Sequence, residues 1–170
     1  MATPTYDLLD SVTLASSASS VTFSSLDTIA AGYRDIILVT DVVAATGSGT
    51  ISPSVRFNSD SGANYAYVFM RSNVSSAGAP DTNQMFLASG AQADETNRGL
   101  YTLEVFDFNK TDKHKSAFAK GLVPADEFYY FAHRWANTSA ITSMEIFARV
   151  TDPTDQFAAT STFYLYGIAG

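Results

Sequence analysis

Short apolar segments, separated by breaks rich in Gly, Ser, Asn, Asp and Pro, run through the whole chain. In residues 141–150 the apolar Met144, Ile146 and Ala148 stand opposite the polar Ser143, Glu145 and Arg149, the period of two that places successive side chains on opposite faces of a strand. No segment shows a convincing amphipathic helical period. The apolar segments are residues 6–15, 21–23, 33–43, 51–57, 65–71, 85–88, 100–108, 116–123, 128–136, 141–150 and 161–168.

About nine or ten strands at this spacing predict a β-sandwich or a barrel. We favour an all-β fold, an antiparallel β-sandwich of jelly-roll-like topology, because the strand number and the uneven loop lengths suit it. No internal repeat or second domain is apparent, so we expect a single domain over residues 1–170 with a short N-terminal arm at residues 1–6. A chain of this length can bury roughly 70% of its unfolded surface without help from disulfides or metals.

Three breaks have a predicted conformation. Residues 45–49, with two glycines, are expected to form a flexible loop tip. Residues 58–62 are expected to form the connection of a hairpin between the strands at 51–57 and 65–71. Residues 72–81, rich in Ser, Gly and Ala with one Pro, are expected to form a loop.

Composition and charge exclude several classes of protein. The absence of cysteine removes disulfide frameworks, thiolate nucleophiles and Cys-ligated metals. The net charge of −7 disfavours nucleic acid or an anionic membrane as the main partner. The N-terminal residues lack the positive flank and apolar run of a signal peptide, and no stretch approaches the ~20 apolar residues that span a bilayer. We therefore expect a soluble protein made without a secretion signal.

The two histidines do not form a catalytic or metal-binding pattern. His114 lies in a charged turn, and His133 lies beside aromatic residues on an expected strand. Neither has a second histidine or a carboxylate at the spacing of metal ligands. The sequence alone leaves a Ser-His-Asp triad open, since its members need not be neighbours, but it contains no Gly-x-Ser-x-Gly elbow.

The carboxylates also have ordinary explanations. Glycosidase chemistry needs two acids that flank a cleft, whereas the acids here are expected in exposed loops or on the wet faces of strands. Residues 58–62 superficially resemble a calcium loop but lack its later glutamate, and residues 47–49 lack the Lys-Ser/Thr of a phosphate loop. We predict a protein that is not an enzyme and holds no cofactor or metal. The acids considered are Asp94, Glu95, Glu104, Asp107, Asp126, Glu127 and Glu145.

Five aromatic residues are the candidate binding residues: Tyr129, Tyr130, Trp135, Tyr164 and Tyr166. Exposed Tyr and Trp side chains anchor protein interfaces and stack on sugars. Alternatively, every second member of the aromatic run fills the core. If both groups share an outer face, they form an apolar patch that a monomer rarely tolerates, which predicts a homo-oligomer or a docked partner.

Three stretches carry a family resemblance. The first comprises LLDSVTL at residues 8–14, VTFSSL at 21–26 and YRDIILV at 33–39; the second is VRFNSDSGANY at 55–65, and the third is TSTFYLYGI at 160–168. In this order, and over nearly the whole chain, they resemble a broad group of small β-sandwich virion proteins of tailed phages. That group includes free-standing virion proteins and C-terminal modules of tail fibres. The resemblance implies a structural role in the particle, a trimeric assembly and no catalytic residues.

Within this group we expect a capsid decoration, or cement, protein, because a fibre module needs a shaft and only about five residues precede the first strand. Such a protein is made in the host cytoplasm and binds the major capsid protein on the capsid surface, here as a homotrimer at local threefold sites. The arm at residues 1–6 and the loops at 45–49 and 72–82 are the candidate contacts. The alternative is a tail-associated receptor- or carbohydrate-binding module, in which Trp135 stacks on a glycan.

Overall fold

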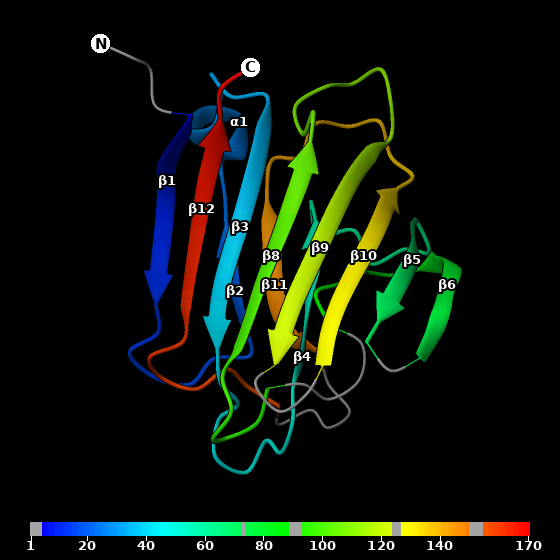
Figure 1. The fold of residues 1–170 in the computed structure, drawn as a ribbon. Coiled ribbons are helices and arrows are strands. Elements are labelled where there is room, and N and C mark those ends of the chain that lie inside the picture. The colour runs from blue at the N-terminus through cyan, green and yellow to red at the C-terminus, as the bar shows by residue number, and fades with distance from the viewer. Residues whose placement is uncertain (1–4, 73, 89–92, 124–126, 150–154) are drawn as a thin grey trace.

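The computed structural model describes residues 5–72, 74–88, 93–123, 127–149 and 155–170. Twelve strands and one four-residue helix make up the regular structure of this part of the chain (Figure 1). None of its helices is long and apolar enough to cross a membrane. The elements are β1 Tyr6–Thr13, β2 Ser20–Phe23, α1 Leu26–Ile29, β3 Asp35–Val42, β4 Ser52–Phe57, β5 Tyr65–Arg71, β6 Val74–Thr82, β7 Met85–Phe86, β8 Gly99–Phe106, β9 Lys115–Val123, β10 Glu127–Trp135, β11 Met144–Arg149 and β12 Thr162–Ile168.

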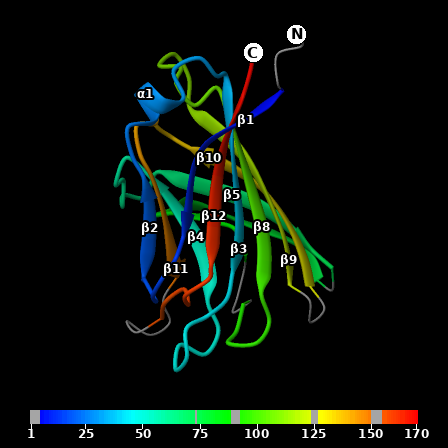
Figure 2. The same ribbon diagram turned by 90° about the vertical axis from the view of Figure 1, so that its left-hand side faces the viewer.

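Eight of these strands form a jelly roll. One sheet contains the run β1-β12-β3-β8, and the other sheet is β2-β11-β4-β7, with all pairs antiparallel. The chain crosses between the sheets at β1–β2, β2–β3, β3–β4, β4–β5, β6–β7, β7–β8, β10–β11 and β11–β12, so neighbours in a sheet come from distant parts of the sequence. Figure 2 shows the two sheets as separate layers. The prediction of an antiparallel, jelly-roll-like β-sandwich is confirmed.

The other four strands widen the first sheet to eight, in the order β1-β12-β3-β8-β9-β10-β5-β6 (Figure 1). They form two hairpins: β9–β10 lies between β8 and β11 in the sequence, and β5–β6 lies between β4 and β7. The two hairpins meet where β10 pairs with β5, from Tyr129 opposite Arg71 to Trp135 opposite Tyr65. This pairing extends the eight-stranded sheet well past the edge of the four-stranded one.

The prediction of a hairpin through residues 58–62 is wrong. Strand β4 belongs to the four-stranded sheet and β5 to the eight-stranded sheet, so this segment carries the chain from one sheet to the other. Asn58 and Ser59 both have left-handed backbone conformations, with φ of 52° and 57°, which redirect the chain at the end of β4. A turn between two strands has the same local sequence pattern whether the strands pair or separate.

The prediction of a loop over residues 72–81 is also wrong, because residues 74–82 form the edge strand β6. An edge strand pairs on one side only and therefore tolerates proline, here Pro80. Gly78 is required by packing, since a Cβ at this position would lie 2.6 Å from the carbonyl oxygen of Tyr67. Small residues that favour loops elsewhere are thus suited to this edge.

An aromatic cluster joins the hairpin extension to the jelly roll. The Trp135 ring on β10 lies 5.6 Å from the Phe57 ring on β4 and 6.3 Å from the Tyr65 ring on β5. The backbone N–H of Phe57 donates to the Tyr65 hydroxyl at 3.0 Å, and burial raises the pKa of that hydroxyl. The three buried rings therefore hold strands of both sheets in contact.

Asp60 closes this cluster by accepting hydrogen bonds from three residues. Its carboxylate accepts from the Trp135 indole N–H at 2.7 Å, the Gly62 backbone N–H at 2.9 Å and the Asn64 side-chain amide at 3.0 Å. Partial burial raises the pKa of Asp60, but these donors outweigh burial and leave the pKa lowered. In residues 58–62, the segment that superficially resembles a calcium loop, the Asp60 carboxylate thus accepts its hydrogen bonds from groups of the protein.

The Asp60→Ala substitution should lower the free energy of unfolding by about 2 kcal/mol, because it leaves the Trp135 indole N–H without its charged acceptor. Urea unfolding at pH 7 measures this change. The matched control is Asp112→Ala, which removes an exposed carboxyl and should change stability by less than about 0.5 kcal/mol. Equal losses in both variants would contradict the role assigned to Asp60.

Candidate functional site

The predicted aromatic residues divide between the core and the surface. Tyr129 and Trp135 point inward and are 0% and 1% exposed, so the prediction that they contact a partner is wrong. Tyr130 points outward from β10, and Tyr164 and Tyr166 are half-buried on β12. The strand period explains the division, since alternate side chains of one strand lie on opposite faces. Binding through Tyr130, Tyr164 and Tyr166 stays a prediction.

The outward side chains form continuous rows across the eight-stranded sheet, whose outer face is turned toward the viewer in Figure 1. Strand register aligns one row over all eight strands and a second row over seven of them. The first row is Leu8, Tyr166, Ile37, Glu104, Phe118, Ala132, Val68 and Gly78. The second row is Ser11, Tyr164, Val39, Thr102, Lys120, Tyr130 and Met70.

The most exposed apolar part of this surface covers β8, β9, β10 and β5, and we call it the outer sheet face. It consists of Val68, Met70, Leu100, Phe118, Leu122, Phe128 and Tyr130, each between 36% and 60% exposed. At roughly 200 Å² per large side chain, these seven expose about 700 Å². That exceeds the roughly 300–600 Å² of the largest apolar patch on a typical monomer. The outer sheet face therefore has the size of an interaction surface.

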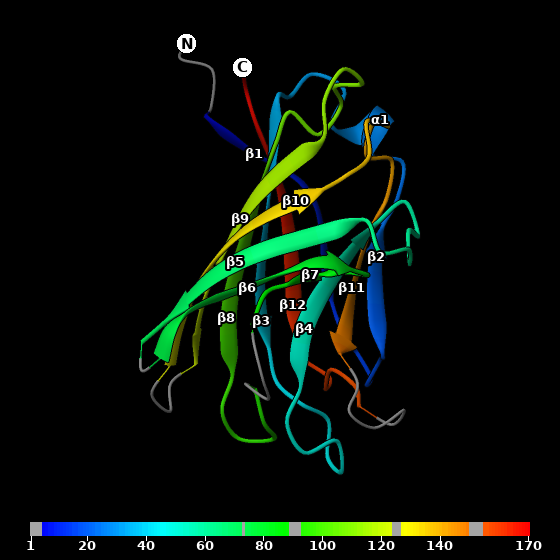
Figure 3. The same ribbon diagram turned by 90° about the vertical axis from the view of Figure 1, so that its right-hand side faces the viewer.

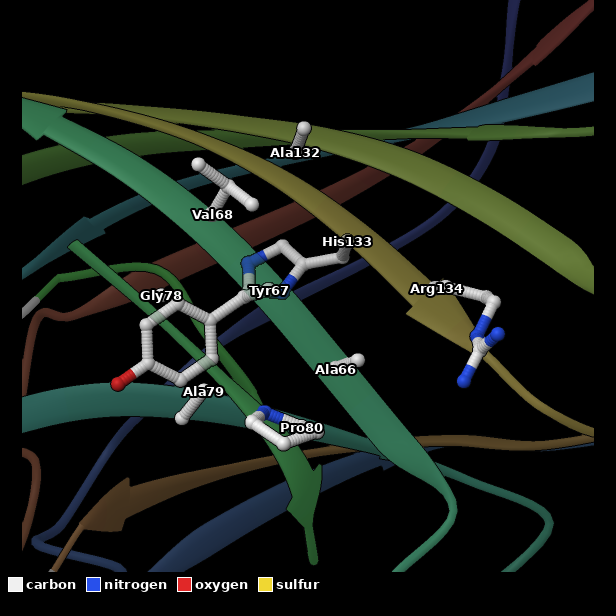
Figure 4. Close-up of a pocket in the computed structure, with 9 residues that line it drawn as sticks. All are labelled: Ala66, Tyr67, Val68, Gly78, Ala79, Pro80, Ala132, His133 and Arg134. Carbon is white, nitrogen blue, oxygen red and sulfur yellow. The ribbon is translucent and has the colours of Figure 1, made fainter. Parts of the chain in front are cut away.

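The outer sheet face has both raised and hollow parts. Aromatic contacts hold a ridge on it, with ring centroids 5.5 Å apart for Phe106 and Phe118 and 6.1 Å apart for Phe118 and Tyr130. Beside the ridge lies a hollow of about 550 Å³ between β10, β5 and β6, where small residues such as Ala132 and Gly78 leave room (Figure 4). A complementary surface could place its own side chains in this hollow.

Charge is nearly balanced on the outer sheet face, although the chain as a whole carries −7. The outward charges described on β8, β9 and β10 are Glu104, Lys120 and Arg134. The excess negative charge therefore lies on other parts of the surface. Two copies that approach through this face meet less like-charge repulsion than through any strongly acidic surface.

His133 is a core residue. Its ring stacks on Phe131 with centroids 5.2 Å apart, and its Nε2 lies 2.9 Å from the carbonyl oxygen of Phe86. A carbonyl oxygen only accepts, so Nε2 carries the proton and donates. Burial lowers the pKa of His133 to about 4. The other histidine, His114, lies exposed in the turn between β8 and β9.

The carboxylates considered for catalysis do not gather at one place. Asp94 caps its own turn, where hydrogen bonds from Asn97 and Thr96 lower its pKa, and Glu95 accepts from the Gly47 backbone N–H. Asp107 pairs with Lys113 at 2.6 Å.

The strand glutamates lie apart from these loop acids. Glu104 and Glu145 project from different sheets, and the side chains of Asp126 and Glu127 lie outside the described part. Among the described residues, no three His, Cys, Asp or Glu side chains form a group that could hold a metal ion.

The lysine-bearing turn at residues 110–115 has a structural role in this fold. Lys115 is fully buried, and its Nζ donates to the carbonyl oxygens of Lys113 and Thr138, each at 3.2 Å. Burial lowers the pKa of Lys115. The side chain thereby ties the start of β9 to the segment that follows β10, a contact that no local sequence signal indicates.

Comparison with known proteins gives a short result. No protein-family model and no curated protein matches the chain. Among solved structures, an alginate lyase of family PL-14 from the marine species Aplysia kurodai is similar at 13% identity and a TM-score of 0.34. The similarity covers 86% of this chain and 71% of that one. A likeness at this level carries no argument about function.

The protonation of His133 alone should lower the free energy of unfolding by about 2 kcal/mol between pH 7 and pH 5. The unfolded chain takes up a proton near pH 6.5, whereas the folded ring stays neutral down to about pH 4, so acid favours unfolding. His133→Gln, which keeps a donor for Phe86, should lose this part of the pH dependence in urea unfolding. His114→Gln should retain it; if His133→Gln retains it as well, the assignment is wrong.

Proposed function

We propose that this chain is a non-enzymatic structural protein of a tailed-phage particle, a capsid decoration protein that binds the major capsid protein. The observation that carries the proposal is the outer sheet face, an apolar surface of about 700 Å², close to the roughly 800 Å² that each partner contributes to a standard interface. The resemblance of residues 8–39, 55–65 and 160–168 to phage virion proteins supplies the biological setting.

The outer sheet face is proposed to join copies of this chain into a homotrimer. Three copies around a threefold axis can each turn this face toward the axis and remove its apolar side chains from water. The near balance of charge on the face favours contact between copies that otherwise repel one another at −7 each. Tyr130 lies within this face, whereas Tyr164 and Tyr166 lie on β12, outside the strands that form it.

We propose that residues 45–49, in the loop between β3 and β4, contact the capsid. Gly47 and Gly49 have φ of 85° and 61°, so the turn adopts a conformation that other residues rarely take. Residues 74–82 would contribute a strand edge to the shell, since they form β6. Many weak contacts of this kind stabilise a shell by mass action.

The self-association is tested with two leucines that are equally exposed, at 55% each. Leu122→Asp places a charge in the outer sheet face, whereas Leu8→Asp places one on the far edge strand β1. Sedimentation velocity at micromolar concentration should give a trimer for the wild type and for Leu8→Asp, and a monomer for Leu122→Asp. A monomeric wild type, or equal dissociation of both variants, would overturn the proposed interface.

The virion role is tested by counting copies of the chain in purified particles with quantitative mass spectrometry against the major capsid protein. Hundreds of copies are expected for a decoration protein on the shell. A handful would move the chain to the tail and make a receptor- or carbohydrate-binding module the better assignment. Complete absence would overturn any virion role.

A further inference from the structure

The outer face of the four-stranded sheet lies on the opposite side of the sandwich from the outer sheet face (Figure 3). It carries a cluster of two arginines and two phenylalanines. The Arg56 guanidinium lies over the Phe147 ring, 4.3 Å from its centroid, and the Arg149 guanidinium lies over the Phe86 ring at 4.9 Å. The two cation–π pairs occupy neighbouring positions of the same sheet. We call this cluster the Arg–Phe hollow.

Strand register explains how the two pairs come together. Phe147 on β11, Ser54 on β4 and Phe86 on β7 face one another in a row. Arg56 stands two residues from Ser54 along β4, and Arg149 stands two residues from Phe147 along β11, on the other side of the row. Each arginine leans diagonally toward the row, so the two guanidinium groups flank a common space.

That space is a hollow of about 560 Å³, within the range of roughly 300–1,000 Å³ found for small-molecule sites. Besides the two arginines and two phenylalanines, it is lined by Asp81, Thr82, Asn83 and Gln84. The Gln84 side chain is buried and donates to the Ser54 hydroxyl at 3.2 Å. Ordered polar groups therefore build part of the wall.

Neither arginine has a carboxylate within ion-pair distance among the described residues. Arg34, Arg98 and Lys113, in contrast, pair with carboxylates at 2.6–2.7 Å. The Nε of Arg56 donates to the carbonyl oxygen of Asn83 at 3.2 Å. Its two terminal nitrogens make no hydrogen bond with the described residues. Two guanidinium groups that form no ion pair with the described residues, in a chain of net charge −7, indicate an anionic ligand.

Two acids near the hollow narrow the class of ligand. Asp81 lines it, and Glu145 faces Arg56 across the β4–β11 pair. A purely anionic ligand, such as an acidic peptide, would be repelled by these carboxylates. A sugar ring that bears both a carboxylate and hydroxyl groups matches the whole set, since guanidinium binds the carboxylate while Asp81 accepts from a hydroxyl.

We propose that the Arg–Phe hollow binds a uronic-acid saccharide. Stacking on Phe147 and Phe86 holds each guanidinium in place, so less side-chain entropy is lost on binding. The site is separate from the proposed trimer interface, because its arginines and phenylalanines lie on the four-stranded sheet and leave the outer sheet face free.

Isothermal titration calorimetry with a hexamer of galacturonic acid tests the proposal on the full chain. The wild type should bind, and Arg56→Gln and Arg149→Gln should each weaken binding about tenfold or more through the loss of charged hydrogen bonds. The matched control Arg134→Gln removes an arginine from the other sheet and should leave binding unchanged. Equal melting temperatures of the three variants establish that each remains folded.

Three results would overturn the proposal. The first is no binding of the wild type at millimolar saccharide, and the second is equal binding of a neutral galactose hexamer. The third is equal binding of a hexamer of glutamate, which would assign the hollow to an acidic peptide. Leu122→Asp should bind the saccharide like the wild type, so the failure of one proposal is distinguishable from the failure of the other.

Discussion

The pairing of β10 with β5 is the constraint on which the wide sheet depends. It joins two hairpins that are inserted at separate places in a jelly roll, and neither hairpin has another strand to pair with on that side. Isolated two-stranded hairpins are marginally stable in water. The Trp135 indole, bonded to Asp60 and packed against Phe57, fixes one end of this pairing to the jelly roll. One aromatic anchor in the core therefore holds the end of the β10–β5 pairing against the jelly roll.

The same pairing leaves the inner face of the extension covered by aromatic contacts and the outer face exposed to solvent. On the inner face, the buried Phe131 stacks on Phe69 at 5.3 Å, and Tyr67 meets Phe86 of the edge strand β7 at 5.2 Å. Phe69, Tyr67 and Phe86 are partly buried by these contacts. On the outer face, the intervening residues of the same strands remain exposed, because no third layer covers them in the described chain. A sheet that is wider than its partner layer thus creates an apolar surface as a direct result of its topology.

Most of the fold was accessible from the sequence, whereas the partners of each strand were not. Period-two alternation located the strands, and residues 65–71 coincide with β5. It failed for β6, whose small residues and Pro80 carry no alternation because an edge strand needs little side-chain packing. It could not separate a hairpin from a crossover at residues 58–62, since that choice depends on β11 and β10, some 80 residues away.

The candidate sites also depend on long-range strand pairing, which the sequence does not reveal. Sequence located the aromatic run but not its phase, so Tyr129 and Trp135 stood among the candidate binding residues with Tyr130. The alternative, that every second residue of the run fills the core, is the one that the strand adopts. The Arg–Phe hollow left no local signal at all, because Arg56 and Phe147 are distant in the chain and become neighbours only through the β4–β11 register. Long-range pairing in a jelly roll therefore decides which side chains can act together, and a site of this kind is visible only once the sheet order is known.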